Sequence, residues 1–578
     1  TVDGVTTIGT VKEKAEAKMQ FQKAVSKGQS AGLVQSTGRK MEHFKVTVNV
    51  AAFANVIFVL TYEELLKRHL GNYELSLNLN SLSKTSRLIN KTNCLLQINA
   101  YIIEPQGIRF LEAHGTFITN ELTNVVQINH TEKQAQITFK PTMDQQRKCP
   151  KCTETLLDGD FLIKYDVKRE NSAGNIQIAN GYFVHYFAPA SLQKVPKNVV
   201  FVIDHSGSML GQKIKQTYEA FLKILADLPE EDHFGIVIFD DKISARGATD
   251  INKALLAAMK MLKNTSTNKL LPKVSTSIIL FLSDGEPTSE VNSFILFHWV
   301  TNHNKIINNV KKANERQTTL YCLGFGNDVD FNFLEKLALE NGGLARRIYE
   351  DSDAALQLQG FYNEVANPLL LNVQLQYLEN SVSDLTKNNF RHYYQGSEIV
   401  VAGHINNGNL ESLTTEVVGQ GVSEQFSVNV ETNITEVEKA TKELQYIFGD
   451  FTERLWAYLT IEQLLTQQIS AEGENKERII KKALELSLKY NFVTPITSMV
   501  VTAPKDNDEN KELIANKPQE GGITLNGVMT KDNMFNRFGI VNKKSNLKVD
   551  VSVENITVTL HDEDTKTYLW TSSFHEDG

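Results

Sequence analysis

With 578 residues, the chain is too long for a single hydrophobic core, and several domains are expected. Hydrophobic residues make up 41%, yet no apolar run approaches the roughly 18 to 20 residues of a membrane span, so no such span is predicted. The net charge of -8 is mild and basic residues are dispersed, which argues against nucleic-acid binding. Four cysteines are too few for a disulfide-built scaffold.

The N-terminal part of the chain has a β-rich pattern preceded by one helix. Residues 11–33 are charged and Ala-rich and predict a helix that ends near Gly28 or Gly32. Short runs of alternating apolar and polar residues then predict antiparallel, sandwich-like sheets. These runs are residues 43–50, 56–64, 73–79, 96–102, 134–140 and 160–167.

From Lys197 the pattern changes to apolar strands that alternate with amphipathic helices. This alternation predicts a doubly wound α/β sheet, in which ligands bind beyond the carboxyl ends of the strands. Strand patterns return after Leu370, so the α/β unit is expected to be inserted between β segments. The predicted fold is a multi-domain α+β protein: a β-rich N-terminal region and a β-sandwich, an inserted doubly wound (Rossmann-like) domain, and a helical segment after it.

The most informative stretch is residues 198–209, a run of apolar β-formers that ends on Asp204, Ser206 and Ser208. Two later residues complete the pattern: Thr249 precedes a helix, and Asp284 ends a second apolar run. Carboxylate and hydroxyl oxygens at the carboxyl edge of a sheet suit a hard cation such as Mg²⁺. These five residues are therefore predicted to form a Mg²⁺ site with one position open for an outside carboxylate.

Two other interpretations apply to the residues of this predicted Mg²⁺ site. Asp204 and Ser206 could merely cap the following helix. A metal-dependent hydrolase would need a His or Glu base beside the metal. His205 is adjacent in the sequence, but its side chain is expected to point away from the metal if the ligands alternate, and no activated nucleophile accompanies it. The sequence therefore predicts a binding device and not an enzyme.

The predicted α/β unit with these site residues resembles a von Willebrand factor type A domain with its metal-ion-dependent adhesion site. The wider chain is similar to the inter-alpha-trypsin inhibitor heavy chain family, including its N-terminal (VIT) domain. The segments that carry this resemblance follow the family order over most of residues 10–505. They include AGLVQSTGRKMEHFKVTVNV, LTYEELLKR, IEPQGIRFLEA, FKPTMDQQRKCPKC, GYFVHYFAP, DVDFNFLEKLALEN, RLWAYLTIEQLL and FVTPITSMVV.

The resemblance implies a secreted, extracellular matrix or plasma glycoprotein with a role in hyaluronan metabolism. Its relatives are carried on the chondroitin sulfate of bikunin, the serine protease inhibitor light chain, and are transferred to hyaluronan. The implied partners are therefore hyaluronan, chondroitin sulfate and a bikunin-type light chain, with an acidic protein ligand at the metal site. The alternative is an intracellular type A domain scaffold without a hyaluronan role, because cytosolic proteins also pair these two domains.

Domain boundaries follow from the same comparison of patterns. We expect an incomplete N-terminal domain (1–75), a β-sandwich in two parts (76–192 and 367–435), a type A domain (197–366), a helical region (436–505) and a linker (506–522). The last segment (523–578) is expected to be a fragment of the domain that ends the family's heavy chains.

Three departures from the family accompany this expectation. The Asp-Pro-His motif that forms the ester in the family does not occur in these 578 residues, so covalent coupling to a glycosaminoglycan is not predicted for them. Few residues separate the strand 234–239 from Thr249, where type A domains fit another edge strand and helix. The opening strands of the N-terminal domain are missing. A chain truncated at both ends, or a splice form, would explain all three.

Cysteines and glycosylation sequons add the remaining candidate sites. Cys149 and Cys152 form a CPKC motif that could be a zinc half-site, a redox motif or a local disulfide, and the family resemblance favours the disulfide. Cys322, inside a predicted strand, is expected to be a buried free thiol. Sequons that suit a secreted protein occur at Asn90, Asn129, Asn264, Asn433 and Asn555.

Overall fold

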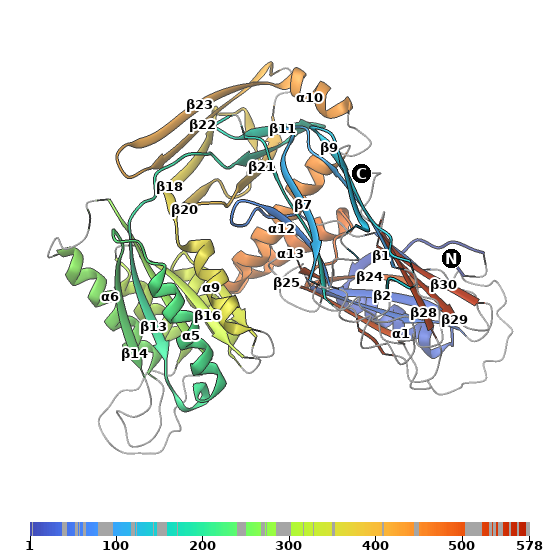
Figure 1. Ribbon diagram of the computed structural model, residues 1–578, viewed down its shortest axis with the longest axis horizontal. Coiled ribbons are helices and arrows are strands. Elements are labelled where there is room, and N and C mark those ends of the chain that lie inside the picture. Colours follow the sequence, from blue (N-terminus) through green and yellow to red (C-terminus); the bar gives the residue numbers. More distant parts are fainter. Residues whose placement is uncertain are drawn as a thin grey trace.

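The computed structural model describes residues 1–573 with internal gaps. The gaps are residues 3, 37–42, 52–55, 57, 62–64, 79–95, 117–121, 123, 143, 147–158, 170, 240–249, 268–271, 273, 285–301, 316, 327–328, 350–352, 407–409, 444–449, 503–522, 531–533, 536–538, 542–546, 554–555 and 563–565. Figure 1 shows an α/β unit at one side, a pair of smaller sheets above it, and large sheets at the other side.

The N-terminal helix α1 (Lys14–Ser26) is shorter than the charged segment that predicts it. It ends close to Gly28, which takes a positive φ of 69°, a conformation that glycine adopts without steric cost. The predicted end near Gly28 is confirmed. The alternative end near Gly32 is wrong, because Gly32 lies in strand β2 (Ala31–Ser36).

Two large sheets combine strands from both ends of the chain. One has the order β1-β24-β2-β3-β25-β26-β5-β10-β7, with β27 paired to β25, and the other has the order β4-β30-β29-β28-β6-β9-β8. Strand β24 lies between β1 and β2, so a segment near residue 500 completes the N-terminal sheet. The bounds are β1 Thr10–Glu13, β3 His43–Asn49, β4 Phe58–Thr61, β5 Tyr73–Asn78, β6 Leu96–Ile103, β7 Ile108–Gly115, β8 Val126–His130, β9 Gln134–Phe139, β10 Asp160–Val167, β24 Thr497–Thr502, β25 Ile523–Thr530, β26 Met534–Phe535, β27 Gly539–Val541, β28 Leu547–Val553, β29 Ile556–Asp562 and β30 Lys566–Ser573.

Two four-stranded sheets face each other and enclose an apolar core. Their orders are β11-β12-β21-β19 and β20-β18-β22-β23. The bounds are β11 Asn175–Ala179, β12 Tyr182–Phe187, β18 Pro368–Tyr377, β19 Val382–Ser383, β20 Asn389–Tyr394, β21 Ile399–Ile405, β22 Ser412–Gln420 and β23 Gln425–Asn433. Because β12 pairs with β21, strands from before and after the α/β unit share one sheet, and that unit is an insertion. Strands from residues 76–192 are thus divided among three sheets.

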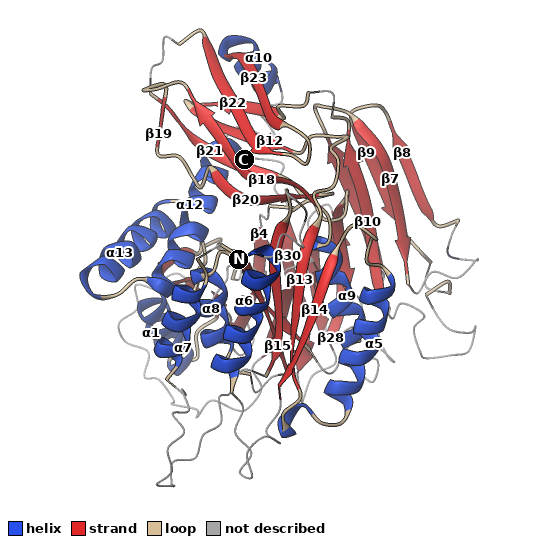
Figure 2. Cartoon of the chain, turned by 90° about the vertical axis from the view of Figure 1, so that its left-hand side faces the viewer, coloured by secondary structure: helices blue, strands red, loops and turns tan. Residues whose placement is uncertain are grey.

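The inserted unit is a parallel sheet with the order β14-β13-β15-β16-β17. Helices α5 and α9 cover one face, and α6, α7 and α8 cover the other (Figure 2). The predicted doubly wound architecture is confirmed. The bounds are β13 Lys197–Asp204, α5 Gln212–Ala226, β14 His233–Phe239, α6 Ile251–Thr267, β15 Thr276–Ser283, α7 His303–Ala313, β16 Thr319–Phe325, α8 Phe331–Glu340, β17 Ala345–Ile348 and α9 Ala354–Val365.

The amino-terminal edge of this sheet docks against strand β20. The Thr276 hydroxyl lies 2.8 Å from His392 Nε2, and the hydroxyls of Tyr321 and Tyr394 are 2.7 Å apart. Burial, with the nearby Arg391 guanidinium, lowers the pKa of His392 to about 4, so the imidazole is neutral at ordinary pH. The carboxyl edge of the sheet is therefore the end farther from the paired sheets.

In the described part of the chain, three helices follow β23: α10 (Ile434–Glu443), α12 (Phe451–Ser470) and α13 (Gly473–Lys489). Helix α12 packs Leu455 and Trp456 against the β12–β21 sheet, and the Trp456 indole donates to the Asp384 carbonyl at 2.7 Å. Burial of these side chains fixes the helical region to the sandwich. Among the described residues, the helices lack the length and apolarity needed to cross a membrane.

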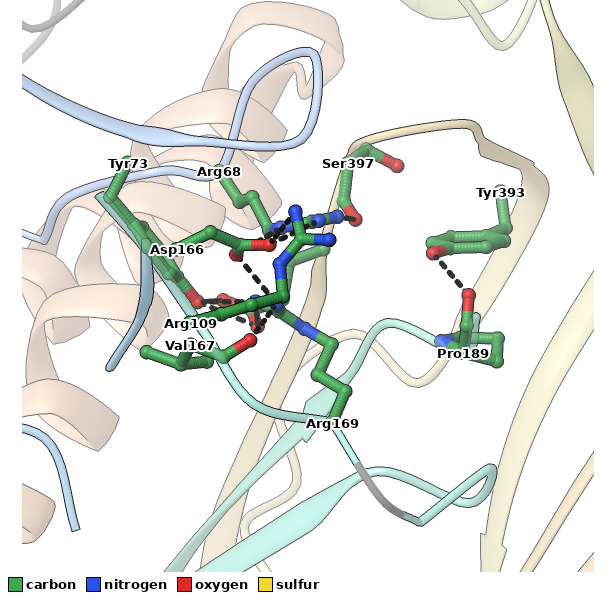
Figure 3. A network of polar contacts seen from close by, with 10 residues as sticks. Arg68, Tyr73, Arg109, Asp166, Val167, Arg169, Pro189, Tyr393 and Ser397 are labelled. Carbon is green, nitrogen blue, oxygen red and sulfur yellow. Dashed lines mark hydrogen bonds and ion pairs between the residues drawn. The ribbon is translucent and has the colours of Figure 1, made fainter. Parts of the chain in front are cut away.

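A polar network around the buried carboxylate of Asp166 joins four parts of the chain (Figure 3). Arg68 donates to both carboxylate oxygens of Asp166, at 3.0 and 3.1 Å, and Arg109 and Arg169 reach the same carboxylate at 2.9 and 2.6 Å. Against the opposing effect of burial, Arg68 and Arg169 hold the pKa of Asp166 below its ordinary value. Tyr73 donates to Glu398, just before β21, at 2.9 Å. The network therefore fixes the N-terminal sheet to the sandwich.

Glu104, beside this network, generates a pH-dependent prediction. Burial, together with the negative charges of Glu398 and Asp166, raises its pKa to about 7. A carboxyl group with a raised folded pKa favours the folded state below its unfolded pKa, and that contribution is lost as pH rises from about 4.5 through 7. We expect the free energy of unfolding of Glu104→Gln to exceed that of wild type by roughly 2 to 3 kcal/mol at pH 8, and the difference to vanish near pH 4.

Urea unfolding at several pH values measures this difference. Glu112→Gln, on the neighbouring strand β7, is the control and should not change the pH dependence. A Glu104→Gln variant whose stability follows wild type between pH 5 and 8 would contradict the assignment.

Candidate metal centre

Strand β13 carries the centre of the candidate site to the carboxyl edge of the sheet. All eight of its residues are buried, and the run of β-branched and aromatic residues at 199–203 is typical of a central parallel strand. The strand order reverses between β13 and β15, since β14 lies on one side of β13 and the later strands lie on the other. Ligands of open α/β sheets bind at this switch point. Asp204 ends β13, and Asp284 follows β15 directly.

Asp204 is fully buried and held by two neighbours. Its Oδ1 accepts the backbone N–H of Ser206 at 2.9 Å, and its Oδ2 accepts the hydroxyl of Ser283 at 2.5 Å. The hydroxyls of Ser206 and Ser208 lie 3.1 Å apart. Ser206 is buried whereas Ser208 is exposed, so the pair leads from the buried carboxylate to the surface.

The second carboxylate, Asp284, is also buried, and its Oδ2 has no hydrogen-bond partner among the described residues. Burial is the main cause that raises the pKa of Asp204, and the negative charge of Asp284 adds to it, while Ser283 and Ser206 oppose the shift. Within the described ranges, no ion pair involves either carboxylate. Two buried carboxylates without a positive partner are costly.

The helix-capping explanation for Asp204 and Ser206 is wrong. The short 3₁₀ turn at Gly207–Met209 begins without a side-chain cap from Ser206. Helix α5 begins after Gly211, also without a side-chain cap. Asp204 instead accepts from the turn that carries Ser206 and from the neighbouring strand, so its oxygens do not serve the helix start.

The residues present fit a hard divalent cation. The unpartnered Asp284 oxygen and the raised Asp204 pKa are the features that a nearby positive charge would relieve. Carboxylates and hydroxyls are the oxygen donors that Mg²⁺ prefers, and it keeps some positions for waters or outside ligands. No cluster of three or more His, Cys, Asp or Glu occurs in the described part of the chain, so hydroxyls must supply part of this donor set. The described donors for a cation here are Asp204, Ser206, Ser208 and Asp284.

Five of the predicted site residues lie outside the residues that the structure describes: Thr249, Cys149, Cys152, Asn90 and Asn555. Their roles stay predictions.

Three sequon asparagines are exposed where glycans could attach. Asn129 lies in β8, Asn264 in α6 and Asn433 at the end of β23. The Asn433 side-chain oxygen also accepts from the backbone of Glu436 at 3.0 Å. The prediction for Cys322 is confirmed: it is a buried free thiol in β16, and burial raises its pKa.

Ser283 was not among the predicted site residues. It contacts Asp204 because β13 and β15 pair in parallel with Ile203 opposite Leu282, which places the next residues of the two strands side by side. In the sequence, the one indication that Ser283 belongs to the site is its position directly before Asp284. The register that aligns it with Asp204 is a property of the folded sheet and cannot be read from either strand alone.

Comparison with known proteins agrees with this architecture. The sequence profile of the vault protein inter-alpha-trypsin domain matches residues 1–62, and that of the von Willebrand factor type A domain matches residues 238–364. Inter-alpha-trypsin inhibitor heavy chain H3 of Rattus norvegicus is 50% identical over 550 residues, which cover 91% of this chain and 60% of that protein.

The chain is homologous to the inter-alpha-trypsin inhibitor heavy chains. Heavy chain H3 of Homo sapiens is 49% identical over 90% of this chain and 59% of its own length. Heavy chain H4 of Sus scrofa is 46% identical over 96% of this chain and 61% of its own length. The chain thus spans about 60% of the length of these heavy chains. A solved von Willebrand factor type A structure from Catenulispora acidiphila aligns at 14% identity with a TM-score of 0.34, over 56% of this chain and 89% of that one.

The type A match begins inside β14 and does not include β13. The structure nevertheless places β13 at the centre of the same sheet, paired with both β14 and β15. Asp204, Ser206 and Ser208 therefore belong structurally to the same α/β unit.

Two serine substitutions should separate support of the fold from cation binding. Ser283→Ala removes a 2.5 Å hydrogen bond to a buried carboxylate, and we expect it to lower the free energy of unfolding by about 1 to 3 kcal/mol. Ser208→Ala, at an exposed position, should leave this free energy within about 0.5 kcal/mol of wild type. Chemical denaturation in the presence of EDTA measures both. Equal destabilisation by the two variants would refute the arrangement.

Proposed function

We propose that this heavy-chain homologue is a secreted matrix protein that binds Mg²⁺ through Asp204, Ser206, Ser208 and Asp284, with Thr249 as a further ligand. The observation that carries the proposal is a pair of buried carboxylates, one with an unpartnered oxygen, beside two adjacent hydroxyls at the switch point of the sheet. When bound, the cation supplies a positive charge to which an acidic group of a partner can attach.

The residues at this site have different roles, some orienting a carboxylate and others supplying oxygen ligands. Ser283 and the Ser206 backbone hold the Asp204 carboxylate in one orientation. The Ser206 and Ser208 hydroxyls extend the donor set toward the exposed edge. No His or Glu is predicted to serve as a base beside these donors, so the proposed role is adhesion and not catalysis.

Homology to inter-alpha-trypsin inhibitor heavy chains supports the choice of partners. We propose association with hyaluronan and chondroitin sulfate, and with a bikunin-type light chain that carries the serine protease inhibition. An acidic protein ligand would bind at the metal site itself. The docked amino-terminal edge of the sheet supports this assignment, because it leaves the edge with Asp204 and Asp284 away from the sandwich.

Titration calorimetry tests the metal site. Wild-type protein should bind Mg²⁺ and Asp204→Ala should lose at least ten-fold in affinity, because it removes a carboxylate from the donor set. Asp227→Asn, at the opposite end of α5, is the control and should bind like wild type. Equal Mg²⁺ binding by wild type and Asp204→Ala would refute the site.

Glycan mapping by mass spectrometry tests secretion against the intracellular scaffold alternative. In protein isolated from its natural source, the exposed Asn129 and Asn433 should carry N-linked glycans, because export exposes sequons to the glycosylation machinery. Asn308, which is exposed but lacks a sequon, should stay unmodified. Bare Asn129 and Asn433 would favour the intracellular alternative.

A further inference from the structure

Strand β14 forms one edge of the inserted parallel sheet and exposes an apolar row. Phe234, Ile236 and Ile238 are 56%, 40% and 57% exposed. They lie on the same face as Val199, Phe201 and Ile203 of β13, to which they are aligned in register. The alternate residues Val237 and Phe239 point to the other face and pack against the α6 side of the core. The exposed row is thus an uncovered continuation of a buried face.

Helix α5 extends this apolar surface. Tyr218 and Leu222 lie one helical turn apart and are 42% and 71% exposed. The Tyr218 ring lies 6.4 Å from that of His205, and the His205 backbone donates to the Phe239 carbonyl at 2.8 Å. This places the Tyr218 flank of α5 beside β14. We call the five residues Tyr218, Leu222, Phe234, Ile236 and Ile238 the β14 patch.

The outer backbone edge of β14 has no strand partner among the residues that the structure describes. In the described part of the chain, β14 pairs with β13 alone. The Phe239 carbonyl points toward β13, and backbone groups alternate sides along a strand. The N–H and C=O groups of Phe234, Ile236 and Ile238 therefore point outward. The strand contains neither the charged residues nor the proline with which proteins usually protect an exposed edge.

We propose that the β14 patch is a self-association surface, on which a second copy of this chain adds its own β14 in antiparallel orientation. The inference is independent of the metal site. A two-fold axis at Ile236 pairs Ile236 with its copy, and Phe234 of each chain with Ile238 of the other. All three are outward-facing positions, so about six backbone hydrogen bonds form between the strands. The six apolar side chains meet on one face.

Charges at the two ends of the patch favour the second copy as occupant. Lys215 is exposed one turn before Tyr218, at the end of the patch near Phe239. Glu230 and Glu231 are exposed just before β14, at the opposite end. The antiparallel arrangement brings the basic end of each copy toward the acidic end of the other, whereas a parallel arrangement would bring like charges together.

Sedimentation velocity of the full chain over a range of concentrations tests the association. Wild type should show a monomer–dimer equilibrium, and Ile236→Lys should weaken it at least ten-fold, because a charge on this edge opposes pairing. Leu356→Lys, at a residue of α9 that is 58% exposed, is the matched control and should associate like wild type. Circular dichroism verifies that both variants are folded. A wild-type chain that stays monomeric throughout, or an unaffected Ile236→Lys, would overturn the proposal.

Cysteine cross-linking tests the register. In the proposed dimer the two Ile236 Cα atoms are about 5.5 Å apart, within the range for a disulfide. The two Phe234 positions are separated by four residues along the strands, about 14 Å. Under mild oxidation, Ile236→Cys should give a covalent dimer that wild type and Phe234→Cys do not. Equal cross-linking of the two variants, or none with Ile236→Cys, would overturn this register and with it the two-fold surface.

Discussion

The burial of Asp204 at the end of β13 is the constraint on which the site depends. A carboxylate without exposed surface must be hydrogen-bonded, and it is most stable with a positive partner. Ser283 and the Ser206 backbone satisfy the first condition. For the second, the described side chains supply no ion pair, and the adjacent Asp284 adds a further negative charge. Burying two carboxylates without a positive partner costs free energy, and a bound cation would offset this cost.

The architecture leaves this end of the sheet accessible. The α/β unit enters and leaves the sandwich next to β12 and β18. Thr276 and Tyr321 fix its amino-terminal edge against β20, and Arg391 of β20 donates to the Asn341 carbonyl of the unit. The opposite edge, with Asp204 and Asp284, is then free to meet a partner. Docking covers the amino-terminal end of the sheet and leaves the residues of the β14 patch exposed at its side.

Contacts between segments distant in sequence hold the remaining parts together. The Arg68–Asp166 pair and the Tyr73–Glu398 bond join residues that are 98 and 325 positions apart, and β24 closes the N-terminal sheet between β1 and β2. Such contacts depend on how the sheets are arranged in the folded protein. The sequence pattern of a single strand predicts only that the strand has an apolar face.

The sequence by itself determined the local features of this protein. Apolar runs and helical periodicity placed most elements, including β13, α5 and β15, and the residue types at 204, 206, 208 and 284 indicated oxygen ligands for a hard cation. These features are readable because they depend on neighbours in the chain. Only the tertiary structure brought Ser283 to Asp204, divided the described strands of residues 76–192 among three sheets, and left the outer edge of β14 without a strand partner among the described residues. Strand register and sheet order arise from pairing between distant segments, and no local pattern encodes them.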